Sequence, residues 1–214
     1  LASGREVEAE LRRMRELFLR WNPSTTMKCA IFEENGNRHD MQRVLGHVTL
    51  QNAVRRMGDF VLTSCAANAL QPYRQNDNGW DQGQVFFTPS QVWGMPPYYA
   101  QQMAAAHPRP LTVGCGVEGA DGVLDVTATR SREAGSVVLH IANTGAEPLR
   151  VGLRVDGMRK VSQARMVSLS GDLDAVNTPE EPRRIAPVGR ELPAWAAQTV
   201  DIAPYSYTIV VLDE

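Results

Sequence analysis

The hydrophobic pattern of the chain changes near residue 107, and this change constrains the fold more than any other feature. Before it, helix-period patterns alternate with short apolar runs. After it, strand-like runs follow one another without a helical segment. These runs span 111–113, 123–128, 136–141, 149–155, 164–169, 199–202 and 206–212. We therefore predict an α/β piece over 1–106 and an antiparallel, jelly-roll-like β-sandwich over 107–214.

The chain begins with a predicted amphipathic helix. Ser3 and Glu6 form an S-x-x-E pattern, in which both side chains satisfy free backbone donors at a helix start. Apolar residues then recur at helical spacing as far as Trp21. Because Leu1 is not an initiator methionine and the helix begins almost at once, we expect that preceding residues are missing.

Strands and helices alternate through the rest of the first piece. The sequence predicts a buried strand over 27–32, a helix capped by Asp40, a short strand at 85–87 and a helix over 98–106. The run 60–65 fits either a strand or a helix. Such alternation suggests parallel strands, as in the last units of a (β/α)8 barrel. About 105 residues hold only two or three units, too few for a closed barrel of typically ~250 residues.

Composition argues against two classes of partner. A net charge of −2 and a pI near 6.1 imply no basic surface for nucleic acid. No apolar run approaches the roughly 20 residues of a membrane helix. The cysteines, Cys29, Cys65 and Cys115, are widely spaced and match neither a metal site nor a disulfide framework, so we expect buried free thiols. We expect no metal and no cofactor. The sequence does not determine the cellular compartment, which is either the cytoplasm or, for a secreted bacterial protein, the periplasm or the exterior.

Two adjacent carboxylates follow the first predicted strand. In parallel α/β barrels, catalytic groups lie at the carboxyl ends of strands, where Glu33 and Glu34 occur. If the strand continues, neighbouring side chains point to opposite faces, so only one of them faces a pocket. They cannot form the carboxylate pair of a retaining glycosidase, whose members are about 5–5.5 Å apart across one sugar. The simpler interpretation is that both are solvated loop acids.

Longer stretches resemble family 51 of the glycoside hydrolases, the α-L-arabinofuranosidases. The segments FEENGNRHDMQRVLGH and QNDNGWDQGQVFFTPSQVWGMPPYYAQQM are similar to the regions of the family's seventh and eighth barrel strands. The later segments IANTGAEPLRVGLRVDG, LSGDLDAVNTPEEP and ELPAWAAQTVDIAPYSYTIVVL resemble its C-terminal β-sandwich. The most specific parts are VWGMPPYYAQQM and DLDAVNTPEEP taken together, and the likeness covers nearly the whole chain.

The resemblance implies the identity of the catalytic nucleophile. In the family, a strand ends in Glu, followed by a variable residue and then Ala or Asn. This pattern places the nucleophile at Glu33, with Glu34 in a position that is often aromatic and Asn35 after it. Because Glu34 departs from the pattern, it remains the second candidate. The implied reaction is a double displacement that releases terminal α-L-arabinofuranosyl units from arabinose-containing polysaccharides or oligosaccharides.

The second catalytic carboxyl group is not found in this sequence. In the family the acid/base lies after the fourth barrel strand, and only 32 residues precede Glu33 here. Asp40 is a predicted helix cap, whereas Asp77 and Asp81 lie in a polar loop. We therefore expect a fragment that is inactive without the missing N-terminal part of the same enzyme, which is its predicted partner. A homo-oligomer is a further option.

Three residues are candidates for substrate binding. Asn35 follows the nucleophile position, and Gln91 aligns with a glutamine of the family's eighth strand. Trp93 belongs to a set of aromatic residues near Gln91, together with Trp80, Tyr98 and Tyr99. Aromatic rings suit the CH faces of sugars and amides suit their hydroxyl groups. The alternative for each aromatic residue is core or interdomain packing.

Other polar residues have simpler interpretations. His39 and His47 lack the spacing of a metal site, which favours surface or capping roles. Arg55 and Arg56 are expected on a solvated helix face. As a whole, the chain could instead be a noncatalytic carbohydrate-binding or structural β-sandwich module. A third alternative is a related enzyme that acts on another glycan, such as a β-glucan.

Overall fold

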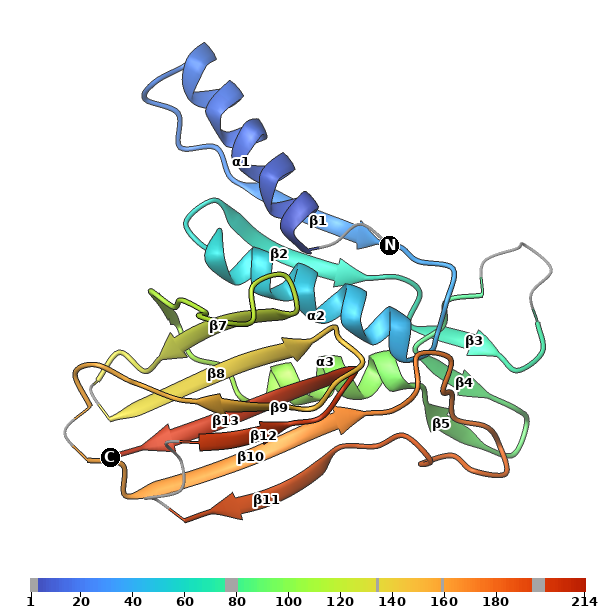
Figure 1. Cartoon of the computed structure of the whole chain (residues 1–214). Helices are drawn as coiled ribbons and strands as arrows, with labels where there is room; N and C mark the ends of the chain where they lie inside the picture. Colours follow the sequence, from blue (N-terminus) through green and yellow to red (C-terminus); the bar gives the residue numbers. More distant parts are fainter. Residues whose placement is uncertain (1–3, 76–80, 134, 159, 194–198) are drawn as a thin grey trace.

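A computed structural model describes residues 4–75, 81–133, 135–158, 160–193 and 199–214 (Figure 1). The helices are α1 (Gly4–Trp21), α2 (Met41–Arg56) and α3 (Pro96–Ala106). The strands of the first piece are β1 (Cys29–Glu34), β2 (Val61–Ala66), β3 (Leu70–Pro72), β4 (Val85–Phe87) and β5 (Val92–Gly94). Those of the second are β6 (Leu111–Val113), β7 (Leu124–Arg130), β8 (Ser136–Asn143), β9 (Leu149–Gly152), β10 (Gln163–Ser170), β11 (Val188–Leu192), β12 (Thr199–Ile202) and β13 (Ser206–Asp213).

A six-stranded antiparallel sheet forms the centre of the molecule, in the order β11-β10-β13-β8-β7-β6. Its central strand, β13, pairs along its whole length with β8 on one side and with β10 on the other. The run SYTIVVL in β13 is buried throughout. A continuous apolar run of this kind is typical of a strand that is covered on both faces.

The two faces of this sheet pack against different layers. Alternate residues such as Leu139 and Val210 contact the two-stranded sheet β9–β12 through Val200 and Ile202. Residues of the opposite parity contact α2 and α3, in a cluster that includes Met41, Val44, Val48, Tyr99, Met103, Val138, Tyr207, Ile209 and Val211. The predicted strand region therefore has a small second sheet on one face, and helices of the first piece cover the other.

Helix α2 joins the two pieces because it is buried on several sides. Val44 and Val48 contact the six-stranded sheet, whereas Val54 packs against the cluster under β1 and β2. Figure 1 shows α2 between β2 and the large sheet. Asp40 caps this helix as predicted, and its carboxylate accepts a hydrogen bond from the Arg43 backbone N–H at 3.1 Å.

One parallel β-α-β unit, β1–α2–β2, precedes the large sheet. The run that the sequence left open, 60–65, corresponds to strand β2. Strand β1 continues through Glu33 and Glu34, which we had expected in a loop. We predicted the C-terminal part of a (β/α)8 barrel here, but the described residues contain no such barrel. The chain is mixed α/β and mostly sheet. The boundary between 106 and 107 remains a prediction, because helices of the first piece share a core with strands of the second.

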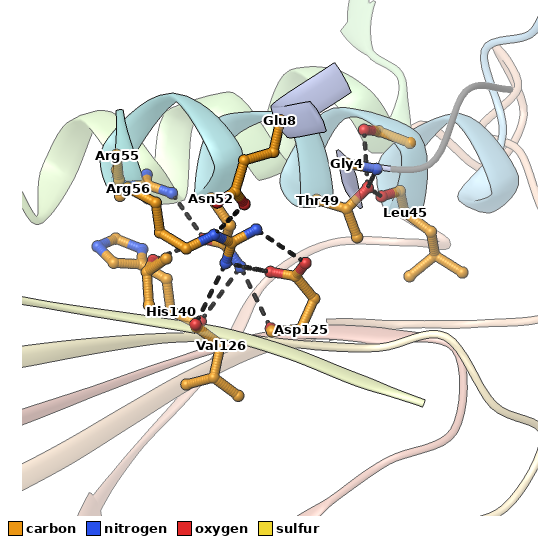
Figure 2. Close-up of polar contacts among 12 residues, drawn as sticks. Gly4, Glu8, Leu45, Thr49, Asn52, Arg55, Arg56, Asp125, Val126 and His140 are labelled. Atoms are coloured by element: carbon orange, nitrogen blue, oxygen red, sulfur yellow. Dashed lines mark hydrogen bonds and ion pairs between the residues drawn. The ribbon is translucent and has the colours of Figure 1, made fainter. Parts of the chain in front are cut away.

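Arg56 ties α1 and α2 to strand β7 (Figure 2). Its guanidinium donates to Glu8 at 2.6 Å and to both carboxylate oxygens of Asp125 at 3.0 and 3.1 Å. The Asn52 amide donates to the same carboxylate at 2.8 Å. Burial alone would lower the pKa of Arg56, but Asp125 and Glu8 raise it. The expectation of a solvated Arg56 is therefore wrong, since this residue joins two layers.

The thiols are more accessible than predicted. Cys65 and Cys115 are exposed and Cys29 is half-buried, because Cys65 faces outward on β2 and Cys115 lies in a glycine-rich loop. Within the described ranges, no cluster of His, Cys, Asp and Glu could hold a metal ion. No helix in that part of the chain is long and apolar enough to cross a membrane.

Candidate active site at the end of strand β1

Glu33 and Glu34 lie at the carboxyl end of β1 in very different environments. The Glu33 side chain is exposed, whereas Glu34 is only 7% exposed. In the parallel pairing with β2, Ile31 is opposite Ser64 and Glu34 is opposite Ala66. Between these two pairs, β1 advances by three residues and β2 by two, so β1 contains one extra residue. This extra residue leaves Phe32 and Glu33 exposed and buries Glu34 beneath α2.

Both carboxylate oxygens of Glu34 are occupied. Oε1 is 2.5 Å from Nδ1 of His47, and Oε2 accepts a hydrogen bond from the Ser64 hydroxyl at 2.9 Å. The Glu34 backbone carbonyl accepts from the Arg43 guanidinium at 3.0 Å. Residues of α2 and β2 thus hold Glu34 from two sides. In this arrangement its carboxylate has no free path to a substrate.

Electrostatics keep Glu34 ionised. Burial alone would raise its pKa, but hydrogen bonds from His47 and Ser64 and the charge of Arg43 outweigh it, so the pKa is lowered. Burial lowers the pKa of His47 more than Glu34 raises it. A neutral imidazole therefore donates its Nδ1–H to an ionised carboxylate. His47 is 2% exposed, so our expectation of a surface or capping role for it is wrong.

Asn35 belongs to a polar network that fixes the loop after β1. The buried Gln82 side chain accepts from the Gly36 backbone N–H at 2.7 Å and donates to the side-chain amide oxygen (Oδ1) of Asn35 at 2.9 Å. Nδ1 of His39 lies 3.1 Å from an Asp81 carboxylate oxygen, which links the same pair of loops. The loop therefore has a defined shape beside Glu33. A β-carbon at Gly36 would lie 1.9 Å from the Arg43 guanidinium, so any other residue here would displace that side chain.

Gln91 and Trp93 have partners elsewhere. The Gln91 amide donates to the Pro179 carbonyl at 2.8 Å, across to the loop between β10 and β11. Trp93 is 4% exposed and packs in a small cluster with Tyr73, Phe86 and Met95. These contacts give both side chains a packing role in this chain. Their contact with a substrate remains a prediction, and Trp80 and Asp77 lie outside the described residues.

Sequence reasoning did not identify the partners of Glu34 and Asn35. His47, Ser64 and Gln82 lie 13 to 47 positions after the residues that they contact. The buried polar residues Gln71, Gln82 and Gln84 cluster in sequence around the loop that folds against Asn35. Three glutamines near short apolar runs were the available signal, but glutamine is mostly exposed, so its type did not suggest burial.

Comparison with known proteins decides the family. The α-L-arabinofuranosidase C-terminal domain family matches residues 22–206. The chain belongs to this family. No curated protein sequence matches it closely enough to count as a relative.

Solved structures of family 51 enzymes share the fold. The thermostable α-L-arabinofuranosidase from Thermotoga petrophila RKU-1 has a TM-score of 0.84 at 17% identity, covering 98% of this chain and 48% of that one. The Thermotoga maritima enzyme, solved with arabinose, has a TM-score of 0.79 at 17% identity, with coverages of 97% and 48%. The enzyme from Xanthomonas axonopodis pv. citri gives 0.74 at 12% identity, with coverages of 97% and 45%.

These structures establish a common fold, and the resemblance to the C-terminal part of family 51 enzymes is confirmed. At such low identities they do not assign roles to residues. The chain also spans less than half the length of these three enzymes.

Proposed function

We propose that this chain supplies the nucleophile, Glu33, of a retaining α-L-arabinofuranosidase that acts on arabinose-containing glycans. The observation that carries the proposal is the exposed Glu33 carboxylate at the carboxyl end of β1 in a parallel β-α-β unit. In α/β barrels this end of the strands forms the active site. The buried Glu34, held by His47 and Ser64, is a poor alternative because an attacking oxygen must reach the anomeric carbon.

The β1–α2–β2 unit is best explained as part of a larger barrel. Parallel sheets occur almost only with both faces covered. Here α1 and α2 cover one face of the pair, while Phe32 and Leu62 are 79% and 70% exposed. Further parallel strands would cover these side chains. We propose that this missing part is also the partner that carries the acid/base.

The acid/base is not supplied by the nearby aspartates that the structure describes. Asp40 is 5% exposed, caps α2 and forms an ion pair with Arg38 at 2.5 Å. Asp81 accepts a hydrogen bond from Gln71 at 2.9 Å and contacts His39. Both are held in structural contacts around the loop. A retaining mechanism needs a second carboxyl group about 5–5.5 Å from the nucleophile, across the sugar.

In the proposed reaction, a Glu33 oxygen forms a bond to the anomeric carbon of the α-L-arabinofuranosyl unit. The bond to the leaving oxygen breaks, and that oxygen takes a proton from the acid/base. Water, deprotonated by the same group, then attacks the glycosyl ester and releases Glu33. Inversion at each of the two steps retains the configuration of the sugar.

Substitution of Glu33 tests the proposal in the enzyme assembled from this chain and its missing part. Glu33→Ala should abolish turnover of an aryl α-L-arabinofuranoside, and azide should restore part of it. Azide would occupy the vacated side and give an arabinosyl azide of inverted configuration by a single displacement. Glu34→Ala should be milder and should not respond to azide. Turnover of an aryl β-glucoside, measured in parallel, tests the alternative that the enzyme acts on a β-glucan.

Activity of the 214-residue chain by itself provides the second test. We expect no turnover by the isolated chain, because one carboxylate cannot perform both steps. Turnover that disappears in Glu33→Ala would show that the acid/base lies within this chain. Full turnover by Glu33→Ala in the assembled enzyme would instead favour a noncatalytic module.

A further inference from the structure

The end of β1 has a side-chain order that strict alternation does not explain. Ile31 packs into the cluster beneath α1 and α2. Alternation would turn Glu33 to the same side and Glu34 to the open face. The extra residue between Ile31 and Glu34 reverses this order. Extra residues of this kind are known to redirect side chains next to active sites.

Contacts from several segments hold the reversed order in place. The Glu34 side chain contacts His47 on α2 and Ser64 on β2. Its backbone carbonyl accepts from the Arg43 side chain and from the Ala67 backbone N–H, both at 3.0 Å. Two of these contacts come from α2, and the other two come from β2 and the residue that follows it. Turning Glu34 outward would break the side-chain contacts together.

His47 interacts with this residue through a single nitrogen. Its Nδ1 contacts Glu34, whereas Nε2 is buried and has no hydrogen-bond partner among the residues that the structure describes. A buried polar atom without a partner is costly. Among the described residues, the contact to Glu34 is therefore the hydrogen bond that this buried imidazole forms.

We propose that Glu34 and His47 form a positioning pair, which fixes the extra residue in β1 and so selects Glu33 as the carboxylate that faces the substrate. Neither member of the pair touches the sugar. The inference rests on the proposed function for its catalytic consequence, but its structural part does not. Without the pair, β1 can shift by one residue, and the two neighbouring carboxylates exchange sides.

Chemical labelling of carboxylates tests the structural part on the 214-residue chain. A water-soluble carbodiimide with an amine nucleophile labels exposed carboxylates, and peptide mass spectrometry separates Glu33 from Glu34. In the wild type, Glu33 should react at least about ten-fold faster than Glu34, because reaction of a buried group requires local opening. His47→Phe fills the space without a donor, and the two rates should become similar.

Three further variants provide controls. His47→Asn keeps an N–H near the position of Nδ1 and should retain the protection of Glu34. His39→Phe makes the same change at a histidine that contacts Asp81 and Phe86 instead of Glu34, and should leave the ratio unchanged. If His47→Phe does not fold, as judged by circular dichroism, Ser64→Ala removes one contact with a smaller change of volume. A protected Glu34 in Ser64→Ala and in a folded His47→Phe would overturn the proposal.

Trapping of the glycosyl-enzyme tests the catalytic part in the assembled enzyme. A 2-fluoro-arabinofuranoside with a good leaving group forms the ester and hydrolyses slowly, which allows active sites to be counted and the labelled residue identified. We expect the label on Glu33 in the wild type. In His47→Phe we expect kcat per trapped site to fall by roughly ten- to a hundred-fold with a smaller change in KM, because misplacement of about 1 Å costs this much.

The outcomes separate the two proposals. A label on Glu33 with unchanged kcat per site in His47→Phe would overturn the positioning role alone. A label on Glu34 in the wild type would overturn both proposals. If Glu33→Ala retains activity, the proposed function fails, while the labelling ratios still decide whether the pair holds the strand.

Discussion

The β1–α2–β2 unit and the six-stranded sheet differ in how completely they are covered. Strand β13 is buried along nearly its whole length, between helices on one face and β9–β12 on the other. Strands β1 and β2 have helices on one face, whereas the side chains of Phe32 and Leu62 are exposed and are not covered by those helices. The large sheet therefore holds most of the buried core, and the parallel pair carries the candidate chemistry.

This difference suggests that the large sheet mainly provides stability and that the parallel pair mainly presents the candidate catalytic residue. A residue at the centre of the large sheet contributes to stability through packing that is complete in this chain. A residue on the open side of β1 contributes little to stability until another layer covers it. Exposure of the charged Glu33 side chain costs little because water solvates it. Helix α2, which supports its strand, is anchored to the large sheet through Val44 and Val48.

The largest expected effect is in the centre of the large sheet. Ile209 is fully buried against α2 and α3, so Ile209→Ala should lower the free energy of unfolding by about 2–5 kcal/mol. Phe32→Ala removes a larger side chain that is 79% exposed, and it should change the free energy by less than about 0.5 kcal/mol. Denaturant unfolding of both variants measures the contrast. Equal losses would show that the parallel pair is as well packed as the sheet.

The sequence predicted the large sheet better than the parallel unit. The runs at 111–113, 164–169 and 206–212 correspond closely to β6, β10 and β13, because apolar alternation and turns bound them. Strand β11 was missed because VGREL is almost entirely exposed and has no apolar pattern. Its position depends on pairing with β10, a tertiary contact that local pattern does not encode.

For the candidate site, the sequence indicated the location but not the supporting contacts. It predicted opposite sides for Glu33 and Glu34 only if the strand continued through them, and β1 does continue, with Glu34 buried and Glu33 exposed. It could not give the extra residue in β1, which depends on the register with β2. It also could not place His47, since α2 is buried on several sides and offers no single apolar stripe.

A pH effect of intermediate size is expected from the core between α2 and β8. Burial, with the nearby charges of Arg55 and His107, lowers the pKa of His140 to about 2. An unfolded histidine titrates near 6.5, so between these values the unfolded chain binds a proton that the folded chain does not. Stability from this group is therefore present above pH 6.5 and is lost as the pH falls.

Substitution of His140 isolates this contribution. The loss approaches about 1.4 kcal/mol per pH unit below 6.5, and it should disappear in His140→Gln. The overall stability of His140→Gln will be lower, because the hydrogen bond of 2.8 Å to Tyr207 is changed, so slopes are compared rather than absolute values. Free energies of unfolding at pH 5, 6, 7 and 8 give these slopes. Plots of the free energy of unfolding against pH should be parallel for the two proteins above pH 7. Plots that are also parallel below pH 6 would contradict the prediction.

The smallest effect on stability, but a distinct effect on association, is expected at the open side of the parallel pair. Phe32 and Leu62 are exposed on neighbouring strands, where uncovered apolar side chains and unpaired strand edges favour contact between copies. Replacing both with Ser should leave the free energy of unfolding within about 0.5 kcal/mol of the parent. It should also raise the monomer fraction of the isolated chain, measured by analytical ultracentrifugation.

Val188→Ser, on edge strand β11, is the control because Val188 is also 70% exposed but lies outside the parallel pair. If Val188→Ser dissociates the chain as well as the double variant does, association does not depend on the open face. If instead only the double variant dissociates, the uncovered side of β1 and β2 is the contact surface between copies of the chain.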